Sequence, residues 1–199
     1  MNRIILGLIL LIAIILLFFW KIGLFGLWTG GISFISSDAE VYTNQEGNII
    51  EGEFPISIDL SNLESNIGKD LYNDGIHRIY VSSLRNTGSV DTGGYTIGFR
   101  AIGQYSLTGA SIISGVHHVS AEENPLPYYL SAKMKAEYNN KVYNSSESWL
   151  SGINYKDGDD FGFYIFPSEA YEKNAVSLNE KGIVNITITG LYKNIWSKK

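Results

Sequence analysis

The first hydrophobic pattern in the chain is an unbroken apolar run from Ile4 to Trp20, which Lys21 interrupts and Ile22 to Trp28 resumes. A helix needs about 20 apolar residues to cross a hydrocarbon core of about 30 Å. As a helix that rises about 1.5 Å per residue, residues 4–28 would extend about 37 Å, enough to cross with some tilt. We therefore predict a transmembrane anchor over residues 1–28.

A cleaved secretory signal is the alternative to an anchor, because Arg3 supplies a basic start. The apolar run of a signal spans about 7–15 residues and ends at a small-residue cleavage site. This run is longer, and only the small residues around 29–31 and 37–39 could serve as such a site. Run length favours the uncleaved anchor. The positive flank favours a cytoplasmic N-terminus, with the C-terminal part outside the cell membrane.

Beyond the anchor, the pattern changes to the two-residue alternation of half-buried strands. It is clearest from Leu130 to Tyr138, where apolar residues alternate with Ser, Lys, Lys and Glu. Further β-prone runs lie at residues 54–60, 76–84, 95–101, 112–119, 161–166 and 184–188. Turn residues separate these runs about every ten residues, and helices do not alternate with them. The chain is therefore predicted to be mainly β, an antiparallel, immunoglobulin-like β-sandwich after one transmembrane helix.

Four other segments have distinct patterns. Residues 41–50 predict a hairpin with a polar turn at Asn44 to Gly47. Helical spacing over residues 60–71, with Ser61 and Glu64 as a capping box, predicts a short helix. Loops are predicted at 122–127, and at 157–160 with the sequence DGDD.

The part beyond the anchor divides into a short tether at residues 29–39 and one extracytoplasmic domain at residues 40–199. All 20 Asp and Glu residues but only 13 of the 15 Lys and Arg residues lie there, so this part is acidic. Nucleic acid is therefore not an expected partner, because binding it requires clustered Lys and Arg. The chain has no cysteine, which excludes disulfides and thiolate chemistry.

Asp157, Asp159 and Asp160 are the candidate metal ligands. Ca²⁺ takes about 6–8 oxygen ligands, and these carboxylates could supply several, with Asn154 as a helper. The segment does not fit an EF-hand register, because two of its ligand positions hold unsuitable residues. A solvated turn between strands is the alternative, and no other cofactor is indicated.

The three histidines and the known catalytic motifs give no predicted active site. His117 and His118 are adjacent on a predicted strand, so their side chains point to opposite faces. His77 is distant in sequence, and zinc needs three or four convergent ligands. Gly-x-Ser-x-Gly, His-Glu-x-x-His and phosphate-loop motifs do not occur. We therefore predict that the protein is not an enzyme.

Two sequons match the Asn-x-Ser/Thr pattern of glycosylation sites. Asn144 lies in a predicted polar loop, and Asn185 lies on the outward face of a predicted strand near the C-terminus. Their occupancy depends on the host.

The segment from Ile79 to Ser89, IYVSSLRNTGS, resembles a recurrent phrase of immunoglobulin-like surface domains. It is similar to segments of membrane-anchored archaeal surface proteins, including pilin-like and archaellum accessory proteins. The resemblance implies an N-terminal helix with a β-sandwich outside. Residues 1–3 leave no room for the processing site of a prepilin, and no functional residue is implied.

Together these patterns predict a single-pass membrane protein with a binding or structural role in the cell envelope. Its partner would be an envelope layer, a filament or a neighbouring membrane protein. A ligand-binding module for sugar or Ca²⁺, secreted or anchored, is one alternative. A surface hydrolase with an unrecognised site is another.

Overall fold

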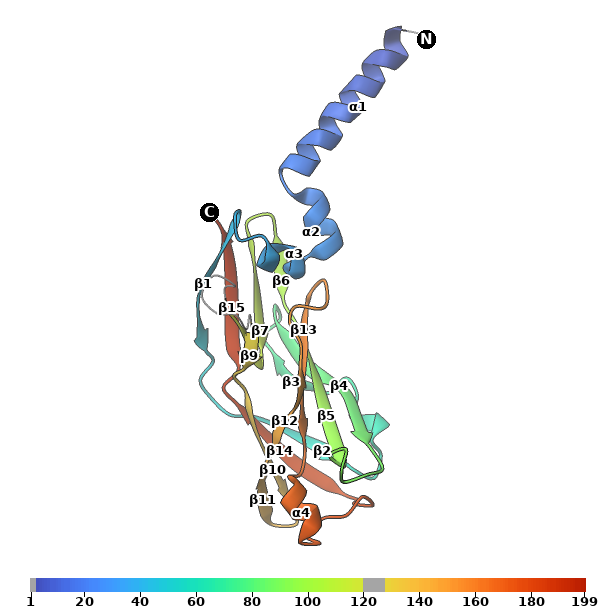
Figure 1. The fold of residues 1–199 in the computed structure, drawn as a ribbon, viewed down its shortest axis with the longest axis vertical. Helices are drawn as coiled ribbons and strands as arrows, with labels where there is room; N and C mark the ends of the chain where they lie inside the picture. The colour runs from blue at the N-terminus through green and yellow to red at the C-terminus, as the bar shows by residue number, and fades with distance from the viewer. Residues whose placement is uncertain (1–2, 120–127) are drawn as a thin grey trace.

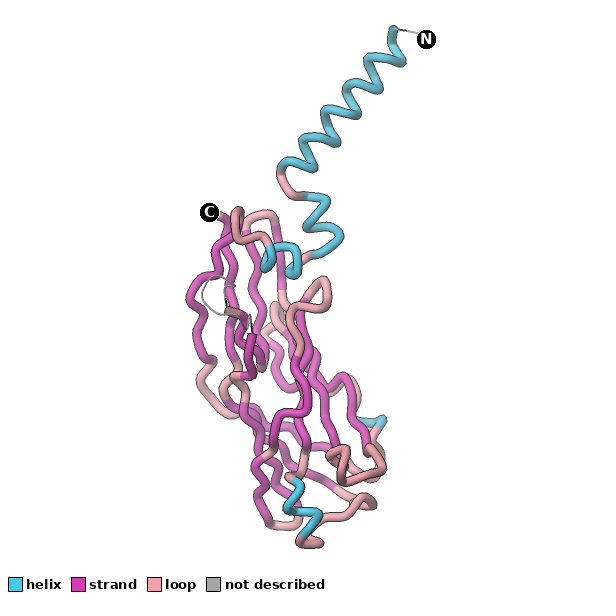
Figure 2. The backbone as a smooth tube through the Cα atoms, in the orientation of Figure 1, coloured by secondary structure: helices cyan, strands magenta, loops and turns pink. Residues whose placement is uncertain are grey.

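The computed structural model describes residues 3–119 and 128–199, so residues 1–2 and the loop predicted at 122–127 lie outside it. An N-terminal helical segment stands on an elongated, mainly β domain (Figure 1). Strands make up most of that domain, and the helices lie at its two ends, apart from one short turn (Figure 2). This arrangement is the predicted one, a single apolar helix followed by a β-rich domain.

Helix α1 (Arg3–Lys21) carries the apolar run and projects away from the domain. Its window Ile4–Lys21 is long and apolar enough to cross a membrane, and none of it is buried against the protein. The predicted continuation of the same helix to Trp28 is wrong. Gly23 has a φ of 80°, a left-handed conformation that ends one helix and starts α2 (Leu24–Gly30) in a new direction.

The predicted tether is folded and packs against the domain. Helix α3 (Ile32–Ser37) buries Ile32 and Ile35 almost completely. The backbone N–H of Ile32 donates to the carbonyl oxygen of Lys156 at 2.8 Å. Gly31 permits this approach, since a Cβ there would lie 2.0 Å from the same carbonyl oxygen. The anchor therefore joins the domain without a free linker.

In the part of the domain that the structure describes, the strands form three antiparallel sheets and a two-stranded pair. Sheet A has the order β1-β15-β7-β6, with bounds Tyr42–Ile49, Tyr192–Lys198, Gly109–Ser114 and Gln104–Ser106. Sheet B has the order β11-β10-β14-β2, with bounds Lys141–Asn144, Lys133–Tyr138, Ile183–Thr189 and Phe54–Asp59. Sheet C has the order β12-β13-β5-β4-β3, with bounds Ser146–Leu150, Gly158–Tyr164, Tyr95–Ile102, Arg78–Asn86 and Asp70–Asn73. The pair is β8 (Val116–His118) with β9 (Tyr128–Leu130), and helix α4 (Ser168–Glu172) precedes β14.

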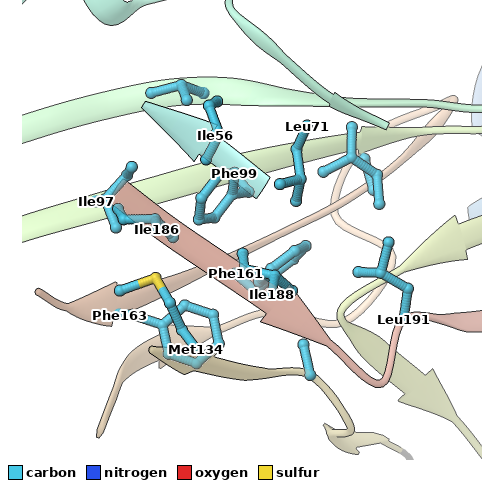
Figure 3. Close-up of a cluster of buried hydrophobic side chains, with 14 of the residues drawn as sticks. Ile56, Leu71, Ile97, Phe99, Met134, Phe161, Phe163, Ile186, Ile188 and Leu191 are labelled. Atoms are coloured by element: carbon cyan, nitrogen blue, oxygen red, sulfur yellow. The ribbon is translucent and has the colours of Figure 1, made fainter. Parts of the chain in front are cut away.

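The core lies between the inner faces of these sheets. Sheet B contributes aliphatic side chains and Met134, and sheet C contributes phenylalanines (Figure 3). Phe99 and Phe161 stack with ring centroids 5.5 Å apart. Along β10, buried and exposed residues alternate without exception, as the sequence pattern predicts. The sheets are open, and the antiparallel β-sandwich is confirmed.

The predicted hairpin at residues 41–50 is wrong. β1 is one strand along β15, with a bulge between Gln45 and Asn48. A Cβ on Gly47 would lie 1.9 Å from the carbonyl oxygen of Lys193. Glycine therefore serves here for close approach to the neighbouring strand, and not for a turn.

The predicted helix at residues 60–71 is also wrong, because only a 3₁₀ turn forms at Glu64–Asn66 before β3. The fully buried side chain of Asn66 bonds to backbone groups of Asp59 and to the carbonyl oxygen of Asn62. Such bonds compete with helix formation. The predicted DGDD loop differs as well, since Gly158 already begins β13.

Candidate functional site

A pocket of about 400 Å³ lies between α3 and sheet A. Helix α3 lies at the anchor end of the domain (Figure 1). One wall consists of α3 serines, and the other of polar and aromatic residues of the sandwich. Its main lining residues are Ser33, Ser36, Ser37, Tyr42, Asn44, His118, Tyr128 and Trp196. The pocket therefore exists because α3 packs on the sandwich.

His118 and Asp159 form a buried pair at the wall of this pocket. His118 Nε2 lies 2.6 Å from Asp159 Oδ2, and Asp159 is completely buried. The other carboxylate oxygen accepts a hydrogen bond from Ser114 Oγ at 2.7 Å. Both oxygens of Asp159 are thus satisfied, as a buried carboxylate requires.

Side-chain amides fix the backbone that carries His118. The Asn194 side-chain oxygen accepts the backbone N–H of His118 at 2.8 Å, and its Nδ2 donates to the carbonyl oxygen of Val116 at 2.9 Å. Asn44 Nδ2 donates to the carbonyl oxygen of His118 at 2.9 Å. Because β8 is short and, within the described part of the chain, pairs with β9 alone, these amides supply bonds that a wider sheet would provide. The imidazole is therefore held in one position.

The other pocket groups combine hydroxyls with aromatic rings. Ser36 and Ser37 donate to carbonyl oxygens of α3, at 3.2 and 3.0 Å. The Tyr42 hydroxyl donates to the carbonyl oxygen of Leu107 at 3.4 Å. Burial, and then the charge of Asp38, raise the pKa of Tyr42, so its phenol stays neutral. Such a lining suits a small ligand with several hydroxyls and an apolar face.

His117 points away from the pocket, as expected for adjacent strand residues. Its ring stacks on Tyr192 with centroids 3.8 Å apart, and its Nδ1 is hydrogen-bonded to the hydroxyl of Tyr129. Burial, and then the neighbouring His118, lower the pKa of His117. The two histidines do not share a ligand.

The three candidate calcium ligands face different partners. Asp157 forms an ion pair with Arg100, whereas Asp159 points into the core toward His118. Asp160 lies on the opposite face, where Ser151 and Asn154 donate to its Oδ1.

The structure thus brings Asn154 to Asp160 but separates Asp159 from both. Within residues 3–119 and 128–199, no group of three or more His, Asp or Glu side chains is arranged to hold a metal ion. Calcium binding stays a prediction.

Both sequon asparagines are exposed. Asn144 ends β11, at the edge of sheet B. Asn185 lies on the outward face of β14, where it accepts a hydrogen bond from Ser57 Oγ at 2.8 Å. Glycosylation at either residue stays a prediction.

The pair of His118 and Asp159 is the part of the site that sequence reasoning misses. The two residues are 41 positions apart, and no motif links them. The available signal is local: Asp159 stands two residues before Phe161, the start of the apolar run, so on a strand its side chain shares the face of Phe161. An inward carboxylate at that place needs a partner.

Comparison of the chain with protein-family models, with curated proteins and with solved structures finds no match. No family membership follows. The geometry of the site is therefore the guide to its chemistry.

Proposed function

We propose that this protein is a single-pass membrane protein whose β-sandwich, outside the cell membrane, binds a component of the envelope. One observation carries the proposal: α1 is apolar and unburied, whereas α3 is part of the domain core. An exposed apolar surface of this size is unfavourable in water and suits a bilayer. The docked α3 then holds the sandwich close to that bilayer.

The flanks of α1 support an outward domain. Arg3 lies at its start, and Trp20 and Trp28 are 72% and 69% exposed near its other end. Basic residues favour the cytoplasmic side, and tryptophan favours the membrane interface. We infer a cytoplasmic N-terminus, with α2 at the outer interface.

The pocket beside α3 supports a binding role over a purely structural one. Serine hydroxyls and aromatic rings together suit a saccharide of the envelope, because a sugar has hydroxyls and an apolar ring face. A calcium site at Asp160 is the alternative ligand site. An immunoglobulin-like topology and a relationship to archaeal surface proteins are predictions that this proposal does not need.

Cysteine labelling tests the topology, since the natural chain has no cysteine. Lys141→Cys places a thiol on the exposed β10–β11 hairpin, and Asn2→Cys places one before α1. In intact cells, a membrane-impermeant maleimide is expected to label Lys141→Cys only. Labelling of the other variant alone, or release of the protein by an alkaline carbonate wash, contradicts the proposal.

Crosslinking in native membranes, read by mass spectrometry, tests the binding role. One envelope component is expected to dominate the crosslinks of the wild-type chain. Ser36→Phe fills the pocket and is expected to remove that component, whereas Ser65→Phe, on an exposed turn, is expected to keep it. Equal crosslinking by both variants excludes the pocket as the binding site.

A further inference from the structure

Ser111, His77 and Asp74 form a hydrogen-bonded chain outside the pocket beside α3. His77 Nδ1 lies 3.0 Å from Asp74 Oδ2, and His77 Nε2 lies 2.9 Å from Ser111 Oγ. His77 is 3% exposed and Ser111 is 9% exposed. Asp74 and His77 belong to the turn between β3 and β4, whereas Ser111 belongs to β7 of another sheet. Only the fold brings these residues together.

The turn fixes the carboxylate of Asp74. Its Oδ1 accepts the backbone N–H groups of Ile76 at 2.9 Å and His77 at 2.6 Å. Partial burial on its own would raise the pKa of Asp74, but the hydrogen bonds from His77 and Ile76 outweigh it and hold the pKa well below its usual range. Asp74 is therefore an ionised group that only accepts hydrogen bonds at neutral pH.

The ionised carboxylate determines where the protons lie. Because Asp74 only accepts, Nδ1 of His77 carries the proton of their shared bond. In the neutral tautomer with its proton on Nδ1, Nε2 is an acceptor, and the hydroxyl of Ser111 is the donor to it. Gln104 Nε2 donates to Ser111 Oγ from 3.5 Å. The hydroxyl proton thus points at a base, which is the resting arrangement of an activated serine.

Ser111 borders a shallow groove of about 310 Å³ at the junction of β6, β7 and β15. Ile195 and Gln104 pair with Ser111 on the two neighbouring strands, so their side chains share its face of the sheet, and both line the groove. A short acyl chain fits such a space. Gln104 Nε2, which lies 3.5 Å from Ser111 Oγ, supplies an N–H donor beside the attacking oxygen.

We propose that Ser111 is the nucleophile of an ester hydrolase that cleaves short-chain acyl esters, with His77 as general base. Asp74 is a positioning residue, and Gln104 is the oxyanion donor. This site is distinct from the proposed binding pocket. It would supply the surface hydrolase activity that the sequence motifs do not indicate.

The reaction proceeds in two balanced steps. Ser111 Oγ bonds to the ester carbonyl carbon while its proton moves to His77 Nε2. The carbon–oxygen bond to the alcohol then breaks, and His77 returns the proton to the leaving oxygen. Water, deprotonated by His77, attacks the acyl-serine, releases the carboxylic acid and restores the Ser111 hydroxyl.

A fluorophosphonate probe tests the nucleophile in the full-length protein in detergent, because such probes modify activated serines. Mass spectrometry is expected to find the probe on Ser111. p-Nitrophenyl acetate hydrolysis above background is expected to disappear in Ser111→Ala and to fall about 10²–10⁴-fold in His77→Gln. Gln104→Leu is expected to lower kcat about 10²–10³-fold with little change in KM.

Ser65→Ala is the control, since Ser65 lies on an exposed turn outside the groove, where its hydroxyl donates to the carbonyl oxygen of Asn62. Its labelling and hydrolysis are expected to equal those of the wild type. Thermal melting of each variant shows whether it is folded. Failure of the folded wild type to label at Ser111 overturns the proposal, and so does labelling that persists undiminished in folded His77→Gln. Neither result affects the membrane and crosslinking tests.

Discussion

His118 Nε2 and Asp159 Oδ2 lie 2.6 Å apart inside the sandwich, with Asp159 fully buried and His118 only 6% exposed. The next residue, Asp160, lies on the opposite face of the same strand with partners near the surface. Two neighbouring carboxylates thus have opposite environments, because strand side chains alternate between faces. Their energetic roles should differ accordingly.

Asp159→Ala is expected to lower the free energy of unfolding by about 3–5 kcal/mol, since it leaves Ser114 and His118 buried without their partner. Asp160→Ala is expected to cost about 1 kcal/mol or less. Urea denaturation of the full-length variants in detergent measures both. If both substitutions lower the free energy of unfolding equally, the buried pair of His118 and Asp159 stabilises the domain no more than the surface carboxylate of Asp160 does.

Gly98 and Gly162 face each other across β5 and β13, and the ring of Trp149 lies over both. A Cβ at either position would approach this ring to 2.5 Å. Gly162→Ala is therefore expected to cost about 1–3 kcal/mol through overpacking. Thermal and urea unfolding measure the loss.

A double-mutant cycle identifies the cause of that loss. With Trp149→Ala in place, Gly162→Ala is expected to cost much less, because the clashing ring is gone. Gly7→Ala serves as the control, since nothing lies within 4 Å of a Cβ at that position. An unchanged cost in the Trp149→Ala background would exclude the ring as the cause.

The sequence predicts those parts of the fold in which one local pattern decides the outcome. The apolar run of α1 and the alternation along β10 both appear in the structure as predicted. The length of the apolar run decides the first case, and the two-residue period of the hydrophobic residues decides the second.

The errors arise where a distant residue decides the local structure. Gly47 looks like a turn residue, yet it is a contact point for the backbone of Lys193. Residues 60–71 have helical spacing, but the buried side-chain amide of Asn66 bonds to backbone carbonyl groups and a long helix does not form.

The contacts between His118 and Asp159, and between His77 and Ser111, span 41 and 34 residues. They follow from sheet order, which hydrophobic periodicity does not specify. For this reason neither the pocket nor the proposed nucleophile could be predicted from the sequence.

The docking of α3 predicts that the tether, residues 29–39, contributes to the stability of the domain. Ile32→Ala and Ile35→Ala are each expected to cost about 2–5 kcal/mol, because each leaves a cavity in the core. Ile12→Ala, on α1 and 52% exposed in the protein, is the matched control and should leave domain unfolding unchanged. Unfolding is monitored by near-ultraviolet circular dichroism in detergent. If the Ile32 and Ile35 variants behave like the control, α3 is an independent linker.

Glu180 links three groups near the end of the sandwich opposite the anchor. Its Oε1 accepts the backbone N–H and the hydroxyl of Ser177 at 2.7 and 2.9 Å, and its Oε2 accepts the Tyr138 hydroxyl at 2.8 Å. Burial would raise the pKa of Glu180, but these hydrogen bonds outweigh it, and its pKa is lowered. The ionised form is therefore favoured by folding.

A carboxyl whose pKa is lower in the folded state stabilises the protein above its unfolded pKa, about 4.3 for Glu. That contribution is lost as the pH falls below this value and through the folded pKa. Glu180→Gln is expected to unfold more easily than the wild type at pH 7, and the difference should shrink steadily toward pH 3. Tyr138→Phe, which removes one donor to the carboxylate, should reduce the same pH dependence only in part. The midpoints of urea denaturation of the wild type and both variants are compared from pH 7 to pH 3. If the difference between Glu180→Gln and the wild type stays constant with pH, the charge of Glu180 does not contribute to stability.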